Sequence, residues 1–311
     1  MSAPTVLFVG GVGRSGSTLL ELLLSRQPDV CAVGEVVHLW ERGLRDGERC
    51  GCGTPFGACP FWAAVGDRAF GGWSRVDPGA VLALKAAVDR TRHLPWLARR
   101  RLPARRQEAV ARYAALYRAV YGAAAAVSGA RVVVDSSKHA SLAFALHRAA
   151  AADLRVLHLV RDAPAVAHSW GRRVRRPEVA DREEYMPVLS PGRVSGRWLV
   201  QNAAFDVLAR QAPVRRVRYE DFTAAPETAL AALRVFAGLP PGPSPAAAAP
   251  AAAHSIAGNP LRFAAGPVTV RRDDRWRTAF TGRRRWTVAA ATWPLRLRYG
   301  YLRRPAAREV P

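Results

Sequence analysis

A glycine-rich segment near the N-terminus has the residues of a phosphate-binding loop. Gly11, Gly16 and Thr18 fit the spacing G-x-x-x-x-G-K-[ST]. Ser17 stands where that pattern has lysine, and Arg14 supplies a cation earlier in the turn. Glycines let backbone N–H groups converge, and the N-terminus of a following helix adds partial positive charge. The segment therefore predicts a site for a phosphate or a similar anion, with an ordinary glycine-rich turn as the alternative.

Two further polar clusters follow apolar, strand-like runs. Asp135 begins the tetrapeptide Asp-Ser-Ser-Lys, which ends at Lys138 and comes directly after three valines. Asp135 could ligate magnesium as a Walker B aspartate, or cap a helix. Arg161 and Asp162 close a later run, and Ser169 lies on the helix expected after it. Asp162 is typical of a helix N-cap, and an arginine in such a place is often solvated.

Strands and helices must position these clusters. Apolar, β-branched runs predict strands at residues 5–9, 29–33, 131–134, 155–160 and 214–218. Apolar spacing predicts helices at residues 19–24, 110–124 and 194–208. Strand–helix alternation predicts an α/β, P-loop-like three-layer fold, with a central, mostly parallel sheet flanked by helices. Because such sheets bind ligands at the carboxyl ends of their strands, we expect the three clusters to meet there.

The 311 residues fit a single domain covering residues 1–311. A helical or irregular insertion is expected at about residues 50–128. A basic C-terminal lobe is expected at about residues 254–311, where aromatic residues stand among many arginines. Such a lobe could make peripheral contact with a membrane, or simply pack its aromatic rings and expose its arginines.

Taken together, these motifs resemble the nucleotide-dependent sulfotransferases. The similarity is greatest to actinobacterial members of the branch that includes tyrosylprotein and carbohydrate sulfotransferases. Residues 13–20 (GRSGSTLL) are similar to the family's loop for the 5′-phosphosulfate of 3′-phosphoadenosine 5′-phosphosulfate (PAPS). Residues 160–169 (VRDAPAVAHS) are similar to its 3′-phosphate motif. Weaker similarity extends to residues 50–62, 219–222 and 254–277.

The resemblance implies PAPS as the donor, 3′,5′-bisphosphoadenosine as the product, and no required metal. It places at the 5′-phosphosulfate Arg14, Ser15, Gly16, Ser17 and Thr18. It places at the 3′-phosphate Arg161 and Ser169, with a closing segment that carries Gly258, Asn259, Arg262 and Arg271. A sulfuryl group in PAPS bears less charge than a terminal phosphoryl group, so a loop without the usual lysine fits this donor.

The resemblance also implies catalytic roles. Glu35, in the pair Gly34-Glu35, matches the proposed base of the tyrosylprotein branch. His38 is a rival base, because related cytosolic enzymes use a histidine and because it falls three residues after Glu35. Lys138 lies where that branch has a lysine beside the sulfuryl group, although Asp-Ser-Ser-Lys departs from its Asn-Lys-Asp. Arg14 and Lys138 are thus candidates to stabilise charge on the leaving oxygen.

Composition bounds the possible functions. The 47 lysines and arginines outnumber the 24 acidic residues, and the formal net charge is +23. This charge favours an anionic ligand, a nucleic acid or an anionic membrane surface. The sequence has no apolar run of about 18 residues and lacks the layout of a signal peptide, which together predict a cytoplasmic protein.

Three cysteines stand close together at Cys50, Cys52 and Cys59. They could be three corners of a metal site, a redox-sensitive pair or buried thiols. The spacing C-x-C-x₆-C lacks the paired C-x-x-C of a zinc ribbon, and no fourth ligand is evident. No metal is therefore predicted.

The predicted function is in-line transfer of a sulfuryl group from PAPS to a hydroxyl of a small-molecule, sugar or lipid acceptor. One alternative is a phosphate-loop kinase or nucleotidase with Asp135 holding magnesium, which Ser17 disfavours. Another is a basic nucleic-acid-binding protein, which leaves the glycine loop unexplained, so no nucleic acid is expected as a partner.

Overall fold

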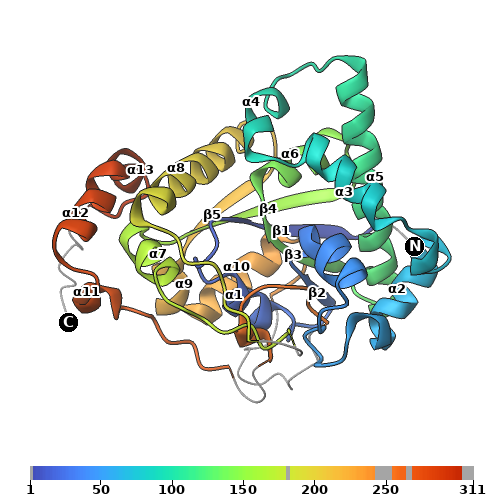
Figure 1. The fold of residues 1–311 in the computed structure, drawn as a ribbon, viewed down its shortest axis with the longest axis horizontal. Coiled ribbons are helices and arrows are strands. Elements are labelled where there is room, and N and C mark those ends of the chain that lie inside the picture. Colours follow the sequence, from blue (N-terminus) through green and yellow to red (C-terminus); the bar gives the residue numbers. More distant parts are fainter. Residues whose placement is uncertain (1–2, 180–182, 242–253, 264–267, 303–311) are drawn as a thin grey trace.

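A computed structural model describes residues 3–179, 183–241, 254–263 and 268–302. A single sheet crosses the centre of the molecule, with strand order β2-β3-β1-β4-β5 and every neighbouring pair parallel (Figure 1). The strands are β1 (Thr5–Gly11), β2 (Val30–Gly34), β3 (Val132–Lys138), β4 (Asp153–Val160) and β5 (Val214–Arg218). The predicted parallel sheet and its five strands are confirmed.

Helices join the strands and cover both faces of the sheet. Those of the described residues are α1 (Ser17–Leu24), α2 (Pro60–Phe70), α3 (Pro78–Val88), α4 (Leu94–Leu97), α5 (Ala104–Ser128), α6 (Ala140–Arg148), α7 (Ala163–Trp170), α8 (Pro191–Leu208), α9 (Tyr219–Ala224), α10 (Pro226–Phe236), α11 (Trp276–Ala279), α12 (Gly282–Ala291) and α13 (Trp293–Arg298). The helices predicted from apolar spacing correspond to α1, α5 and α8.

The alternation of side chains along β1 divides the core into two layers. Val6 and Phe8 are fully buried against the helices α5, α6 and α8. Leu7 and Val9 point to the opposite face and pack with α1, α9 and α10. Because successive side chains of a strand point to opposite faces, a central strand with both sets buried requires helices on both sides. The three-layer α/β architecture is confirmed.

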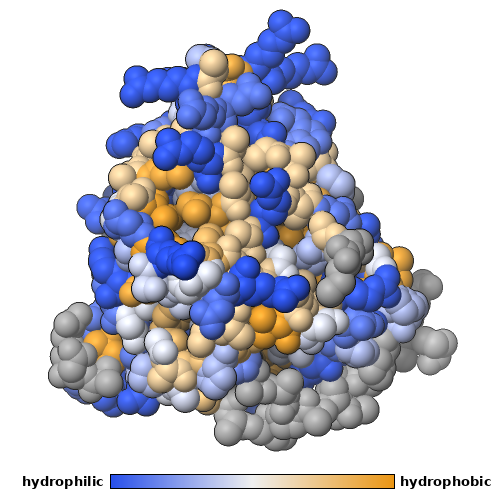
Figure 2. Space-filling view, turned by 90° about the vertical axis from the view of Figure 1, so that its right-hand side faces the viewer, coloured by the Kyte–Doolittle hydropathy of each residue, from blue (hydrophilic) through white to orange (hydrophobic). Residues whose placement is uncertain are grey.

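Helices α2 to α5 all lie between β2 and β3, in the stretch where an insertion was predicted. Their interior is aromatic: Trp40, Trp62, Tyr113 and Tyr117 are fully buried. The Trp40 indole N–H donates to the Tyr117 hydroxyl at 3.2 Å. These rings continue the core on the α5 side of the sheet. The outer face of this region mixes hydrophilic and apolar side chains (Figure 2).

Helices α11 to α13 pack beside α7 and α8, at the end of the sheet away from α2 (Figure 1). Trp198, Val288 and Tyr299 are buried in this contact. Residues 264–267 and 303–311 of the basic C-terminal stretch lie outside the described part. The division into one domain, an insertion and a C-terminal lobe stays a prediction. Among the described residues, no helix combines the length and apolar character needed to cross a membrane.

Candidate active site

A cavity of about 990 Å³ opens at the carboxyl ends of the central strands. The loop after β1 lines it, and so do Glu35 after β2, Lys138 at the end of β3 and Arg161 after β4. The three polar clusters of the sequence therefore contribute to one cavity. This is the edge at which parallel α/β sheets bind their ligands.

The loop between β1 and α1 forms one wall of this cavity. Gly16 has a φ of +95°, and a Cβ atom there would lie 2.5 Å from the Tyr219 ring. Only glycine fits this turn, because φ is positive and the aromatic ring is in contact. Ser17 begins α1, whose first N–H groups have no partner within the helix. Ser17 and Thr18 line the cavity, whereas Ser15 is buried and does not.

Arg14 lies at the tip of the loop and lines the cavity. Its φ is +73°, a left-handed conformation that is uncommon for a residue with a side chain. The guanidinium lies 5.4 Å from the centre of the Trp170 ring, and its Nη2 is 3.0 Å from the Met186 sulfur. Burial lowers the pKa of Arg14 from its ordinary high value. The cation is thus held by an aromatic face and a thioether.

Glu35 lies between two basic side chains inside the cavity. One of its oxygens forms an ion pair with the Lys138 ammonium, and the other is 3.7 Å from His38 Nε2. The side chains of Glu35 and Lys138 are each only 13% exposed, so both charges are largely withdrawn from water. Lys138 also donates to the Ser136 carbonyl at 3.0 Å and has a φ of +67°. Strained backbone of this kind concentrates at functional sites.

His38 is the second titratable group beside Glu35. Burial lowers the pKa of His38 well below its ordinary value, and the neighbouring charge of His139 acts in the same direction. The imidazole is therefore neutral at neutral pH. The two residues that the sequence offers as the base, Glu35 and His38, lie side by side in the structure.

Asp135 lies beneath the cavity, and its carboxylate is turned away from it. The carboxylate accepts hydrogen bonds from the Tyr121 hydroxyl at 2.5 Å and from the Ser137 N–H at 2.7 Å. It is fully buried, and burial raises its pKa to about 6. Asp135 does not line the cavity. This placement contradicts its interpretation as a magnesium ligand, because one carboxylate oxygen is bonded to Tyr121 of α5 and the other to Ser137.

Arg161 is the main cation of the β4 end. Its guanidinium lies 4.4 Å from the centre of the Tyr219 ring and donates to the Asp273 carbonyl at 2.8 Å. The Asp273 carboxylate is 3.6 Å away. A hydrogen bond from Arg275, together with the charge of Arg161, lowers the pKa of Asp273 to about 2. Ser169, on α7, also lines the cavity.

The segment 254–263 reaches the cavity from the edge of the sheet. Ile256 lies beside Gly34 as a short parallel bridge, and its carbonyl accepts the Glu35 N–H at 2.7 Å. Gly258 has a φ of +101°, and a Cβ atom there would lie 3.2 Å from a Glu35 oxygen. Gly258 and Asn259 line the cavity, and their role in nucleotide binding stays a prediction.

Arg262 is placed differently from the expectation. Its guanidinium is buried and donates to two backbone carbonyls, that of Ser255 at 2.7 Å and that of Arg49 at 3.1 Å. It does not line the cavity. The carbonyls occupy the donors that a phosphate would need, so Arg262 holds the segment in place.

The sequence did not single out three further cavity residues: Lys85 on α3, Asp89 directly after α3 and His139 directly after β3. Lys85 donates to the Val37 carbonyl at 2.6 Å, and His139 Nδ1 lies 3.5 Å from an Asp89 oxygen. Lys85, Asp89 and His139 all line the cavity. One signal was available: Lys85 and Lys138 are the only lysines among 47 lysines and arginines, and both face this cavity.

The cavity is strongly basic. Among the described residues that line it, ten cationic side chains outnumber four acidic ones, Glu35, Glu41, Asp89 and Asp273. The cationic residues are Arg14, Arg42, Lys85, Arg90, Lys138, Arg161, Arg172, Arg197, Arg271 and Arg275. Such a surface concentrates a polyanionic ligand.

Comparison with known proteins now identifies the fold. No protein-family model and no curated protein sequence matches the chain. Among solved structures, the chain is similar to the sulfotransferase domain from the Synechococcus PCC 7002 olefin synthase, with a TM-score of 0.50 and 19% identity over 93% of this chain and 95% of that one. It is equally similar to the sulfotransferase domain from the curacin biosynthetic pathway, with a TM-score of 0.50 and 17% identity over 93% and 98%. The chain therefore has the fold of these sulfotransferase domains.

Proposed function

We propose that the protein is a sulfotransferase that moves the sulfuryl group of PAPS to a hydroxyl of a small-molecule acceptor. The observation that carries the proposal is the convergence on one cavity of the glycine loop, the Glu35–Lys138 pair and Arg161. A phosphate-binding loop and a carboxylate base are the two parts that such a transfer needs. The shared fold supports the proposal.

The donor would lie across the carboxyl ends of β1 and β4. The 5′-phosphosulfate would accept hydrogen bonds from the N–H groups that begin α1 and from the Thr18 hydroxyl. The 3′-phosphate would pair with Arg161 and Ser169, both in the cavity. Unlike Arg262, Arg161 lines the cavity, and the 3′-phosphate would replace the Asp273 carboxylate as its anionic partner. Gly258 and Asn259 would close the site from the sheet edge.

The transfer itself is an in-line displacement at sulfur. The acceptor oxygen forms a bond to sulfur while the bond from sulfur to the bridging oxygen of the donor breaks. The electron pair of that bond stays on the departing phosphate, where Lys138, Arg14 and the loop N–H groups stabilise it. Glu35 takes the proton of the acceptor hydroxyl. Lys138 then leaves Glu35 and pairs with the leaving oxygen. This movement couples proton removal from the acceptor to stabilisation of the leaving group.

The acceptor would enter from the side of α3. Lys85, Asp89 and His139 line that part of the cavity together with Arg90 and Gln201. This wall alternates donors and acceptors, which suits a hydroxylated small molecule or a sugar. The two solved neighbours come from an olefin synthase and from a biosynthetic pathway, and this favours a biosynthetic small molecule.

Turnover with a panel of acceptors tests the proposal. Purified protein is incubated with PAPS labelled in the sulfuryl group and with phenols, sugars or lipid alcohols, and both sulfated product and bisphosphate are measured. We expect equal amounts of the two products, and we expect the Glu35→Gln variant to form neither at a comparable rate. Phosphorylated product from ATP, with none from PAPS, would overturn the proposal.

A further inference from the structure

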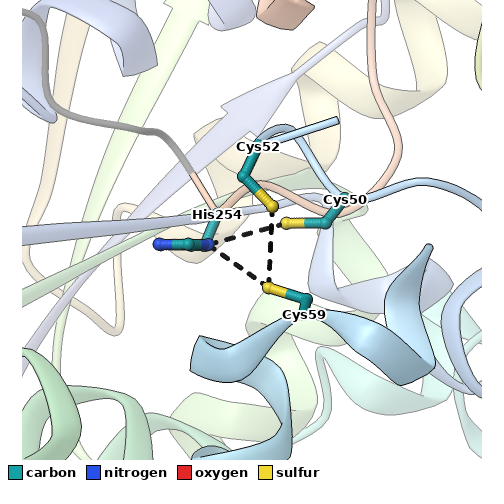
Figure 3. Close-up of side chains that lie close together, drawn as sticks. All are labelled: Cys50, Cys52, Cys59 and His254. Carbon is teal, nitrogen blue, oxygen red and sulfur yellow. Dashed lines mark hydrogen bonds between the residues drawn. The ribbon is translucent and has the colours of Figure 1, made fainter. Parts of the chain in front are cut away.

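Outside the cavity, four side chains that commonly ligate metals converge on one point (Figure 3). They are Cys50, Cys52, Cys59 and His254, and their ligand atoms all lie within 4.8 Å of one another. His254 Nδ1 is 3.3 Å from the Cys59 sulfur and 3.8 Å from the Cys50 sulfur. The Cys52 and Cys59 sulfurs are 3.7 Å apart. All four cysteines of the chain, including Cys31, are free.

These separations match a tetrahedral zinc centre. Zinc binds thiolate sulfur at about 2.3 Å and imidazole nitrogen at about 2.0–2.1 Å. Tetrahedral angles then place two sulfurs about 3.8 Å apart, and a sulfur and a nitrogen about 3.6 Å apart. The three measured separations lie within about 0.3 Å of these values. All six separations are within 4.8 Å, so an ion would draw the four atoms together by about 1 Å at most.

Local structure explains how three ligands come from one short stretch. Arg49 and Pro55 form an isolated antiparallel bridge, and Cys50 N–H donates to the Thr54 carbonyl at 2.8 Å. The resulting tight turn presents Cys50 and Cys52 on the same side. Cys59 stands directly before α2 and completes the set of three.

The fourth ligand comes from a distant part of the chain. His254 lies 195 residues after Cys59. Its ring stacks on Phe61 with centroids 4.7 Å apart, and its carbonyl accepts the Trp62 indole N–H at 3.0 Å. The stacking holds the plane of the imidazole, and the hydrogen bond holds the backbone of His254 beside α2. Cys50 and Cys59 are fully buried.

We propose that Cys50, Cys52, Cys59 and His254 bind a structural zinc ion. Thiolate and imidazole ligands select zinc over the hard cations magnesium and calcium. Four protein ligands leave no open position for a substrate, which is the pattern of a structural site. The expectation of no metal rested on a missing fourth ligand, and the structure supplies that ligand.

The ion would fix the segment that begins at His254 and borders the cavity. His254 begins the segment in which Ile256 pairs with β2 and Gly258 touches Glu35. Binding to three cysteines before α2 would fasten this segment to the helical region, so that Gly258 stays beside the proposed base. The zinc site does not depend on the proposed transfer reaction.

Metal analysis of the tag-free, full-length chain tests the site. We expect one zinc ion per chain by elemental mass spectrometry. We expect Cys52→Ser to weaken zinc binding by more than about 100-fold, because even the outer partners of metal ligands contribute about 10- to 100-fold. Cys31→Ala is the matched control, since it removes a buried thiol outside the cluster, and it should keep its zinc. His254→Cys preserves a fourth ligand and should also keep it.

Two measurements keep the test independent of how well a variant folds. In the wild type, a chelator should lower the melting temperature and added zinc should restore it. Cobalt added to the chelated protein should give the visible absorption of tetrahedral, thiolate-bound cobalt. Three results would each overturn the proposal. One is less than one zinc ion per chain after dialysis against a zinc-containing buffer. The others are equal zinc contents in Cys52→Ser and the wild type, and a disulfide formed by two of the thiols. Zinc bound without sulfuryl transfer would leave this site standing and remove the proposed function.

Discussion

At the scale of single residues, Glu35 is held by Lys138 on one side and by His38 on the other. The lysine neutralises the carboxylate while the donor is absent, and the histidine is kept neutral by burial. A carboxylate in such a place can accept a proton when the ammonium turns toward a leaving group. The proposed mechanism depends on this exchange of partners.

The Glu35→Gln variant tests the base. The amide keeps the size of the side chain but cannot take a proton, so kcat should fall by about 100- to 10,000-fold, the usual range for general base catalysis. The dissociation constant of 3′,5′-bisphosphoadenosine should change little. Steady-state kinetics and calorimetry measure the two effects, with His38→Gln as the matched variant. A large loss of kcat in His38→Gln alone would assign the base to the histidine.

The Arg161→Ala variant tests recognition of the 3′-phosphate. Hydrogen bonds to charged groups contribute about 1.5–3 kcal/mol, so binding of the bisphosphate should weaken by about 10- to 150-fold. Adenosine 5′-phosphosulfate lacks the 3′-phosphate and should bind almost as before. Arg90→Ala, on the α3 side of the cavity, is the control. Equal losses for the two nucleotides would contradict the role given to Arg161.

At the scale of elements, a buried ion pair ties the C-terminal helices to the end of β4. The Arg296 guanidinium of α13 donates twice to the Asp162 carboxylate, at 2.7 and 3.3 Å. The two side chains are only 11% and 8% exposed. Asp162 adjoins Arg161, so the pair also fixes the backbone from which the cavity cation projects.

Removing one member of this pair should be costly. Asp162→Ala leaves the Arg296 charge buried without its partner, and the free energy of unfolding should fall by about 3–5 kcal/mol. Arg45→Ala breaks an exposed pair with Asp46 and should leave the free energy of unfolding nearly unchanged. Urea denaturation compares the two variants. Similar costs would show that the buried pair does not anchor α13.

The sequence predicts the strands well because each is a short run of β-branched and apolar residues. It does not predict which way Asp135 points. Val133 and Asp135 share one face of β3, and Val133 packs on the α5 side, so the aspartate meets Tyr121 instead of the cavity. The sequence shows that side chains alternate between the two faces of β3, but it does not show which helix covers each face.

The sequence predicts that the clusters at the strand ends meet, but it does not show which residues from outside the strands join them. His254 joins the three cysteines only because segment 254–259 lies along β2. Lys85 and Asp89 reach the cavity because α3 folds back over the strand ends. No local spacing encodes such contacts. The glycine-rich loop after β1 could be singled out because its residues are consecutive.

At the scale of the whole molecule, the basic residues behind the net charge of +23 gather on more than one surface. One is the basic cavity. Another is the surface of α12 and α13, where Trp286 and Trp293 are 73% and 55% exposed beside several arginines. Contact of this surface with an anionic membrane stays a prediction, which co-sedimentation with anionic and neutral vesicles tests.

Stability should depend on pH through His158, which is buried beside Asn202. Burial lowers the pKa of His158 to about 4, while an unfolded histidine titrates near about 6.5. Below pH 6.5 the unfolded chain therefore takes up a proton that the folded chain does not. The stabilisation is complete above pH 6.5 and is lost as pH falls toward 4, by about 3 kcal/mol in all.

The His158→Gln variant isolates this contribution. Other buried groups, such as Glu21, whose pKa burial raises to about 7, titrate alike in both proteins. The difference in unfolding free energy between variant and wild type should therefore shift in favour of the variant as pH falls from 7 to 4. Chemical denaturation across this range measures it. Parallel pH profiles would show that the pKa of His158 is the same in the folded and the unfolded chain, which would contradict this account.

The central claim is that the cavity binds a 3′-phosphorylated adenine nucleotide as its donor. Calorimetric titration with 3′,5′-bisphosphoadenosine and with ATP, each with and without magnesium, tests it most directly. The proposed site has no magnesium ligand at Asp135 and places Arg161 at the 3′-phosphate. It therefore predicts tight binding of the bisphosphate that magnesium does not change, and weak binding of ATP. Preferential binding of magnesium–ATP would contradict the account.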